Sequence, residues 1–422
     1  MARKMKDSGI EWIGEIPEGW EVGRIGQLYS ERRTKVSDKD YPPLSVTMKG
    51  ILPQLSTAAK TDAHDDRKLV CKGDFAINSR SDRRGSCGIS EQDGSISLIN
   101  TVLQPRGEMS PGYYNWLFHT SMFADEFYKW GHGIVDDLWT TGWSDMKKIG
   151  VPVPSKCEQK QLAEHLNIEC SNIDSILSKT RSSIEEYKKL KQAVITQAVT
   201  KGVRGEREMK DSGNPWFGQI PSDWKLSRVG LHFSIILGKM LCNAPLNDTY
   251  TLEPYYCAAD VHFDGVADSE RKRMWFSPVE KELYRVSVGD LLVVEGGAGA
   301  GGSAIVENQD SDTYIQNSIM IVRSKGNADN RYLRYLLEFL VKQGYIDIVC
   351  NKATIPHFTK DKLSCVPFCP CPTGEQKEIA DYLDAKCAEI DKLIAKKEQL
   401  VKELENYKKS LIYEVVTGKW EV

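Results

Sequence analysis

The sequence predicts an α+β protein with two similar globular domains, each followed by one long helix. Three observations support this prediction. The chain repeats itself, two segments carry an apolar heptad without glycine or proline, and the remaining parts mix short β-type runs with helical stretches at 113–128 and 331–345. The 422 residues exceed what one ordinary hydrophobic core holds, so we expect more than one domain.

The composition narrows the class of protein. Hydrophobic residues make up 41% and charged residues 27%, which excludes a mainly disordered chain. The net charge of -3 excludes a histone-like protein that coats any DNA, but it allows basic faces that bind specific DNA. Eleven cysteines without a C-x-x-C pair indicate a reducing, cytoplasmic location. We expect neither a signal peptide nor a membrane span.

One repeat begins each half of the chain. The stretch MKDSGIEWIGEIPEGWEVGRIG at 5–26 returns as MKDSGNPWFGQIPSDWKLSRVG at 209–230, a constant offset of 204 residues. A second repeat closes each half at an offset of 217, from Glu158 with Glu375 to Thr200 with Thr417. The extra length of the second half lies mostly between Gly230 and Gly289. These markers place globular domains at 1–155 and 204–372 and helices at 156–203 and 373–422.

The ends of the two halves are alike and their middles differ. A duplicated scaffold that carries two divergent recognition domains explains this pattern. An old duplication whose middles only drifted is the alternative.

The two closing segments have the pattern of coiled-coil arms, because apolar residues recur seven apart in two stripes. Two such arms in one chain pack most simply on each other, and packing of each arm on its own globular domain is the alternative. Lysines interrupt the stripes at Lys191 and Lys408. The predicted core residues are Leu166, Ile173, Leu177, Ile184, Tyr187, Val194, Leu383, Ile390, Ile394, Val401, Leu404 and Leu411.

No catalytic constellation is visible in the sequence. Gly297–Gly302 satisfies G-x-G-x-x-G, but a second strand rather than a helix is expected after it, so a glycine-rich hairpin or ligand-facing loop is the better interpretation. Glu158 and Glu375 open the arms, where acids suit the helix dipole. Cys365, Cys369 and Cys371 match no common zinc spacing, and we expect no metal site.

The repeated W-x-G-x-I-P-x-x-W, the Gly-Asp before a strand and the E-Q-K-x-I/L-A helix after a proline string resemble the specificity subunit of type I restriction-modification enzymes. The resemblance covers the whole chain. It implies two target-recognition domains, separated by two helices that form an antiparallel coiled coil with a pseudo-two-fold axis. Each domain would read one half of a split DNA target, and the coiled coil would set the spacer.

The resemblance also implies the partners. These are double-stranded DNA, two methyltransferase (modification) subunits that dock on the coiled coil, and motor-nuclease (restriction) subunits. The chain itself would be non-catalytic and bind no cofactor. S-adenosylmethionine would bind to the methyltransferase subunit, which methylates adenine.

Polar and basic loops are the candidate DNA contacts, since Arg, Lys, Asn, Ser and Thr side chains read base edges or phosphates. In the first domain these are Ser45, Thr47, Lys49, Asn78, Arg80, Arg83, Arg84, Trp139, Thr140 and Thr141. In the second they are Arg271, Lys272, Arg273, Asn351, Lys352, Thr354 and His357.

Two other functions remain open at this point. One is a stand-alone DNA-binding regulator with two recognition domains, and the other is a coiled-coil protein scaffold without DNA. Basic loops in both domains argue against the scaffold. A long rod with a charged outer face, which leaves room for partner helices, argues against the stand-alone regulator.

Overall fold

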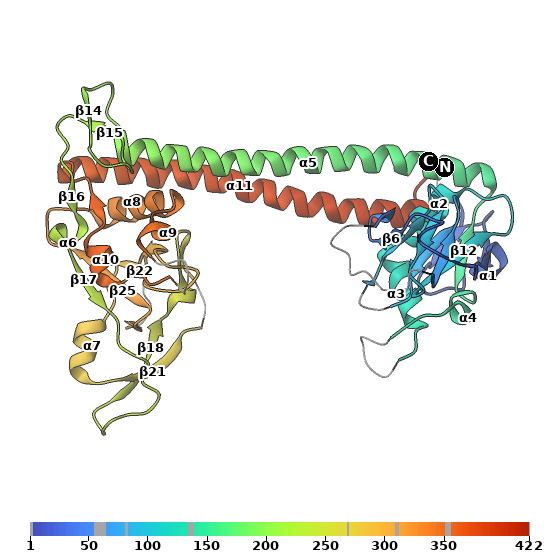
Figure 1. Ribbon diagram of the computed structural model, residues 1–422, viewed down its shortest axis with the longest axis horizontal. Coiled ribbons are helices and arrows are strands. Elements are labelled where there is room, and N and C mark those ends of the chain that lie inside the picture. The colour runs from blue at the N-terminus through green and yellow to red at the C-terminus, as the bar shows by residue number, and fades with distance from the viewer. Residues whose placement is uncertain are drawn as a thin grey trace. The chain divides into compact units, whose positions relative to one another are not determined.

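The structure is a computed structural model that describes residues 3–54, 65–80, 83–133, 139–267, 270–308, 312–350 and 356–421. Two compact units divide the chain (Figure 1). The first comprises residues 1–182 and 397–422, and the second comprises residues 183–396. Each unit therefore holds one globular domain and a segment of both long helices.

In the globular part of the first unit the described helices are α1 (Ile25–Leu28), α2 (Pro111–Phe118), α3 (Ser121–Lys129) and α4 (Trp143–Met146), and the arm α5 (Lys156–Lys201) follows them. Its strands are β1 (Met5–Asp7), β2 (Glu15–Pro17), β3 (Glu21–Arg24), β4 (Tyr29–Glu31), β5 (Lys35–Val36), β6 (Leu44–Thr47), β7 (Gly50–Pro53), β8 (Arg67–Val70), β9 (Phe75–Asn78), β10 (Cys87–Ile89), β11 (Gly94–Ile96), β12 (Asn100–Pro105) and β13 (Gly150–Val153).

The second unit begins in α5 and ends in α11 (Thr373–Val416). Its strands are β14 (Met209–Asp211), β15 (Gln219–Pro221), β16 (Ser227–Arg228), β17 (Phe233–Leu237), β18 (Thr251–Tyr256), β19 (Val261–His262), β20 (Gly265–Val266), β21 (Lys272–Phe276), β22 (Leu291–Val294), β23 (Ser303–Ile305), β24 (Tyr314–Ile315), β25 (Ile319–Ser324) and β26 (Pro367–Phe368). Its other helices are α6 (Val229–His232), α7 (Pro278–Tyr284), α8 (Asn330–Lys342), α9 (Tyr345–Val349) and α10 (Lys360–Ser364).

One framework occurs in both units. An antiparallel four-stranded sheet has the order β10-β9-β12-β4 in the first unit and β23-β22-β25-β17 in the second. The pairs β1–β2 and β3–β13 of the first unit also return, as β14–β15 and β16–β26. The α+β class and the internal repeat are thereby confirmed.

The smaller sheets of the two units differ. In the first unit the order is β11-β8-β5, and both pairs are antiparallel. In the second unit the order is β21-β18-β24, and β18 pairs with β24 in parallel. Each unit thus combines a framework that occurs in both units with a small sheet whose strand pairing differs between them.

Two details of the predicted elements need correction. The expected helix over 113–128 is broken at His119 and Thr120, where the Thr120 hydroxyl accepts a hydrogen bond from the Phe123 amide and caps a new helix, α3. The stretch 331–345 likewise divides into α8 and α9, because Gly344 adopts a left-handed conformation with φ of 87°. The glycine-rich loop 297–302 joins the antiparallel strands β22 and β23, as expected for a hairpin.

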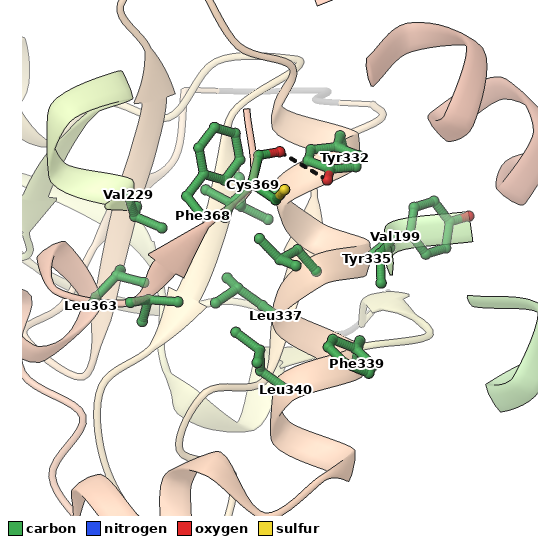
Figure 2. Packing of buried hydrophobic residues seen from close by; sticks show 14 of the residues in the cluster. Val199, Val229, Tyr332, Tyr335, Leu337, Phe339, Leu340, Leu363, Phe368 and Cys369 are labelled. Carbon is green, nitrogen blue, oxygen red and sulfur yellow. Dashed lines mark hydrogen bonds between the residues drawn. The ribbon is translucent and has the colours of Figure 1, made fainter. Parts of the chain in front are cut away.

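The core of the second unit packs α8 against its four-stranded sheet and against both long helices. Figure 2 shows Tyr332, Leu337 and Leu340 of α8 beside Phe368 and Leu363. The Tyr332 hydroxyl donates to the carbonyl of Cys369 at 3.1 Å, which satisfies the one polar atom of a fully buried ring. Ile195, Ala198 and Val199 of α5 join this core, so the end of that helix is anchored in the second unit.

The arms pair antiparallel within each unit. In the first unit Lys408 binds Asp174 at 2.6 Å and Arg181 binds Glu405, so residue numbers rise along α5 as they fall along α11. In the second unit Lys191 binds Asp391 at 2.7 Å. These ion pairs explain the lysines in the apolar stripes, because each one reaches a carboxylate of the opposite helix.

The structure describes all twelve residues predicted for the coiled-coil core. Seven of its residues are buried and five are half-buried. The buried ones are Leu166, Ile173, Leu177, Ile184, Leu383, Ile390 and Leu411, and the half-buried ones are Tyr187, Val194, Ile394, Val401 and Leu404. Each globular domain packs on segments of both arms, which supersedes the alternative that each arm packs only on its own domain. Among the described residues, no helix is long and apolar enough to cross a membrane.

A tryptophan clamp fastens each globular domain to the arms. In the first unit the clamp is Trp20, Glu158 and Arg3, and in the second it is Trp224, Glu375 and Arg207. Glu158 in the first turn of α5 accepts the Trp20 indole N–H at 3.1 Å and binds Arg3, which lies over the Trp20 ring. This contact accounts for the glutamate that opens the arm.

The second clamp repeats the first and is more deeply buried. Glu375 in the first turn of α11 is fully buried, accepts the Trp224 indole N–H at 3.4 Å and binds Arg207. Each tryptophan also contacts the end of the other arm, since a Cβ at Gly202 would lie 3.3 Å from Trp224, and one at Gly418 would lie 2.9 Å from Trp20. The clamps therefore join the start of one arm to the end of the other.

Candidate nucleic-acid interface

The end of β9 brings three predicted site residues of the first unit together. Asn78 is buried, and its side-chain oxygen accepts the backbone N–H of Arg80 at 3.0 Å. Arg80 in turn forms a β-bridge with Thr140. Because this bridge fixes the backbone, the exposed side chains of Arg80 and Thr140 are held beside each other.

The β6–β7 hairpin lies against β10, which is an edge strand of the four-stranded sheet that contains β9. A Cβ at Gly88 of β10 would lie 2.8 Å from the Cα of Gly50 in the hairpin. The predicted residues Ser45 and Thr47 are half-buried on β6, and Lys49 is exposed in the turn. The Thr47 hydroxyl donates to the Gly50 carbonyl at 2.9 Å and so stabilises the turn rather than pointing freely outward.

The other predicted residues of the first unit divide into exposed and internal ones. Arg83 and Arg84 are exposed, and Arg84 binds Asp125 at 3.1 Å. Trp139 donates its indole N–H to the carbonyl of Tyr128 at 2.8 Å, and the buried Thr141 donates to the carbonyl of Phe127 at 2.9 Å. Trp139 and Thr141 thus hold the 139–141 segment in place and leave Thr140 at the surface.

The second unit repeats this arrangement at the end of β22. His357 forms a β-bridge with Gly296, as Thr140 does with Arg80. Its ring nitrogen Nδ1 lies 3.7 Å from the carboxylate of Glu295, and its side chain is 61% exposed. Asn351, Lys352 and Thr354 lie outside the described residues.

The predicted basic run 271–273 lies at β21, and its side chains differ in their contacts. Arg271 binds Asp260 at 3.3 Å and lies over the ring of Tyr256, so the fold itself uses its guanidinium. Lys272 and Arg273 are exposed on the strand.

Sequence reasoning missed a polar group next to Glu295, whose backbone N–H donates to the Ser318 carbonyl at 2.8 Å. Gln316 donates to the Asn317 side chain at 2.6 Å and accepts from the Ser318 hydroxyl at 2.5 Å, just before β25. The repeat offset already paired Asn317 with Asn100, which begins β12 of the first unit. That pairing was the signal that could have pointed to this group.

Two electrostatic features complete the description of the site. Hydrogen bonds from Ser155, Trp20 and Arg3 outweigh the opposing effect of burial and lower the pKa of Glu158, so the first clamp is charged at neutral pH. Among the described residues, histidines, cysteines and carboxylates form no group of three that could hold a metal ion.

The comparisons with known proteins agree with this architecture. A family model, the type I restriction modification DNA specificity domain, matches residues 221–405. The putative type I restriction enzyme MjaX specificity subunit of Methanocaldococcus jannaschii is 24% identical over 97% of this chain and 96% of its own length. The chain thus carries a type I DNA specificity domain and is similar over nearly its whole length to a type I specificity subunit.

A second curated relative is similar to about half of this chain, and two solved structures share its fold. The MjaVIII specificity subunit of the same organism is 26% identical over 53% of this chain and 51% of its own length. A chain from a structural study of assembly and conformational transition in the type I R-M system has a TM-score of 0.73 at 15% identity, covering 96% of this chain and 99% of the other. The HsdS subunit from Thermoanaerobacter tengcongensis has a TM-score of 0.56 at 16% identity, covering 96% and 98%.

Proposed function

We propose that this specificity subunit reads a bipartite DNA target, with each globular domain recognising one half. The observation that supports this most directly is the contrast between repeated and divergent elements. The four-stranded sheets and clamps occur twice, whereas the small three-stranded sheets differ between the units. Two like frameworks with unlike contact elements suit two half-sites of different sequence.

The proposed DNA-contacting surface of the first domain is the exposed set at the end of β9 and in the neighbouring hairpin. It consists of Arg80, Arg83, Arg84, Thr140 and Lys49. In the second domain the corresponding surface contains His357, Lys272 and Arg273. Their charges suit phosphates and guanine edges.

We further propose that the arms dock two methyltransferase subunits, one on each unit. Both units expose an equivalent pair of apolar side chains on the arms. In the first unit the pair is Ile176 and Tyr407, 46% and 48% exposed, and in the second it is Leu393 and Leu190, 36% and 48% exposed. The repeat offset of 217 relates Ile176 to Leu393 and Leu190 to Tyr407. Exposed apolar side chains on a helix pair suit the apolar face of a partner helix.

In this proposal the chain itself is not catalytic. Methyl transfer from S-adenosylmethionine to adenine takes place on the methyltransferase subunits, and motor-nuclease subunits join the complex for cleavage. A stand-alone regulator would need no partner, so the paired apolar positions on both units favour the multisubunit complex.

Methylation with and without the partner tests this function. The purified chain with S-adenosylmethionine alone is expected to leave DNA unmethylated, and addition of a type I adenine methyltransferase subunit from the same cell is expected to yield methylation at one bipartite sequence. Sequencing of the methylated DNA identifies that sequence. Methyl transfer by the chain alone, or methylation without a bipartite pattern, would contradict the proposal.

Replacement of Arg80 tests whether each domain reads only one half-site. Arg80→Ala is expected to weaken discrimination at one base pair of one half-site by about 1–3 kcal/mol, with the other half-site unchanged. The preferred sequence of the variant complex, read from methylated genomic DNA, provides the measurement. Arg33→Ala is the matched control, because Arg33 is an exposed arginine of the same domain that binds Glu31. A changed preference in both half-sites would refute the proposal that each domain reads one half-site.

A further inference from the structure

The β18–β21 ribbon is an antiparallel strand pair of the second unit. It lies between Gly230 and Gly289, where the second half of the chain is longer than the first. The two strands pair antiparallel over five residues, from Thr251 with Phe276 to Tyr255 with Lys272. Figure 1 shows them side by side with α7, at the end of the second unit away from α5 and α11. A recognition element specific to the second half-site would lie in such a segment.

The ribbon has one buried and one outward face, since alternate residues of a strand point to opposite sides. Tyr255, Met274 and Phe276 are buried and pack with Tyr314. The outward face consists of two cross-strand pairs, Leu252 opposite Trp275 and Pro254 opposite Arg273.

Large apolar side chains are exposed on and beside this outward face. Leu252 is 43% exposed, and Trp275 is half-buried. The backbone N–H of Trp275 donates to the carbonyl of Cys242 at 3.1 Å, so the segment before Cys242 runs along the free edge of β21. That segment contributes Met240 and Leu241, which are 75% and 53% exposed. Such a concentration of exposed apolar side chains is typical of a contact surface.

The charge of the ribbon suits a polyanion such as DNA. Arg273 and the adjacent Lys272 form no salt bridge among the described residues. Glu253, which lies between Leu252 and Pro254, is bound to Lys281 at 2.6 Å. The acid on the ribbon is thus neutralised within the protein, whereas the two cations stay available to a polyanion.

We propose that the outward face of the β18–β21 ribbon enters the major groove at the second half-site. Arg273 reads a guanine through its O6 and N7 atoms, and Leu252 with Trp275 contacts the 5-methyl group of a thymine. The major groove admits a two-stranded β-ribbon, and these are the base groups that arginine and apolar side chains recognise. The inference rests on the proposed function and adds the recognition element and two base identities.

The test uses the complex of the full chain with its methyltransferase subunit. Methylation rates are measured on duplexes that carry each single base change, and on duplexes with deoxyuridine in place of each thymine. Arg273→Ala is expected to reduce discrimination at one guanine of the second half-site about tenfold. For the wild type, deoxyuridine at one thymine of that half-site is expected to slow methylation, and Leu252→Ala is expected to abolish this difference.

Leu283→Ala provides the matched control. Leu283 on the neighbouring helix α7 is 48% exposed, close to the value for Leu252, but it does not lie on the ribbon. Its replacement is expected to leave both half-sites unchanged.

Three results would overturn the inference. The first is an unaltered second half-site in both ribbon variants, and the second is an altered first half-site. The third is loss of the methyltransferase subunit from the Leu252→Ala complex, which would make the face a protein-docking surface. Failure of the proposed function is distinguishable, because the wild-type complex would then not methylate a bipartite sequence at all.

Discussion

Glu375→Ala is expected to lower the free energy of unfolding of the second unit by about 3 kcal/mol. Glu375 is fully buried in the first turn of α11, and it binds Arg207 and accepts the indole N–H of Trp224. Alanine at this position removes the buried carboxylate from the mostly buried Arg207 guanidinium, which keeps only the exposed carboxylate of Asp223 at 3.4 Å, and it leaves an indole N–H without its acceptor. The loss of a buried partner costs a buried cation more free energy than the loss of one exposed ion pair.

The measurement is urea unfolding of the full chain, followed by circular dichroism. Glu158→Ala is the matched control, because Glu158 occupies the same place in the first clamp but its side chain is 31% exposed. We expect this control to lower the free energy of unfolding by about 1 kcal/mol, since water can solvate the groups that it leaves unpaired. Equal losses in the two variants would show that burial does not decide the strength of the clamps.

The pH dependence of the first clamp follows from the lowered pKa of Glu158. A carboxyl group whose pKa is lower in the folded state stabilises the fold above its unfolded pKa, and this contribution disappears as the pH falls through its folded pKa. The difference in stability between the wild type and Glu158→Ala is therefore expected to shrink in acid.

Lengthening both arms by four residues is expected to lengthen the spacer between half-sites by one or two base pairs and leave the recognised bases unchanged. Four helical residues add about 6 Å, and base pairs rise about 3.4 Å apart. The same insertion turns the helix by about 40°, which a coiled coil tolerates as a local change of winding.

The structure determines where these insertions belong. Both helices pass from one unit to the other between Ser182 and Ser183 and between Lys396 and Lys397. These four side chains are exposed or half-buried, so the inserted residues displace no core. An insertion near Gln197–Thr200, at the end of α5, would instead move Ala198 and Val199 out of the buried core of the second unit.

Sequencing of methylated genomic DNA gives the spacer of the variant. A four-residue insertion in α5 alone is the control. It shifts α5 relative to α11, so it cannot keep both the Asp174–Lys408 and the Lys191–Asp391 ion pairs. We expect this control to lose methylation. An unchanged spacer with full activity in the double-insertion variant would show that the arms do not set the distance.

The sequence by itself determined the framework of this protein. The offsets of 204 and 217 identified two like halves, and the heptads identified the arms and their core. These features could be predicted because a repeat and a 3.5-residue period are properties of the chain that need no knowledge of distant contacts.

Only the tertiary structure decided which residues face the core and which face outward. Arg271 and Arg273 belong to one basic run, yet one binds Asp260 and the other is exposed, because residues two apart at a strand end meet different surroundings. Leu252 and Trp275 resemble core residues in the sequence, but pairing of β18 with β21 places them on the outward face. Contacts between residues far apart in the chain fix such choices, and no local pattern contains them.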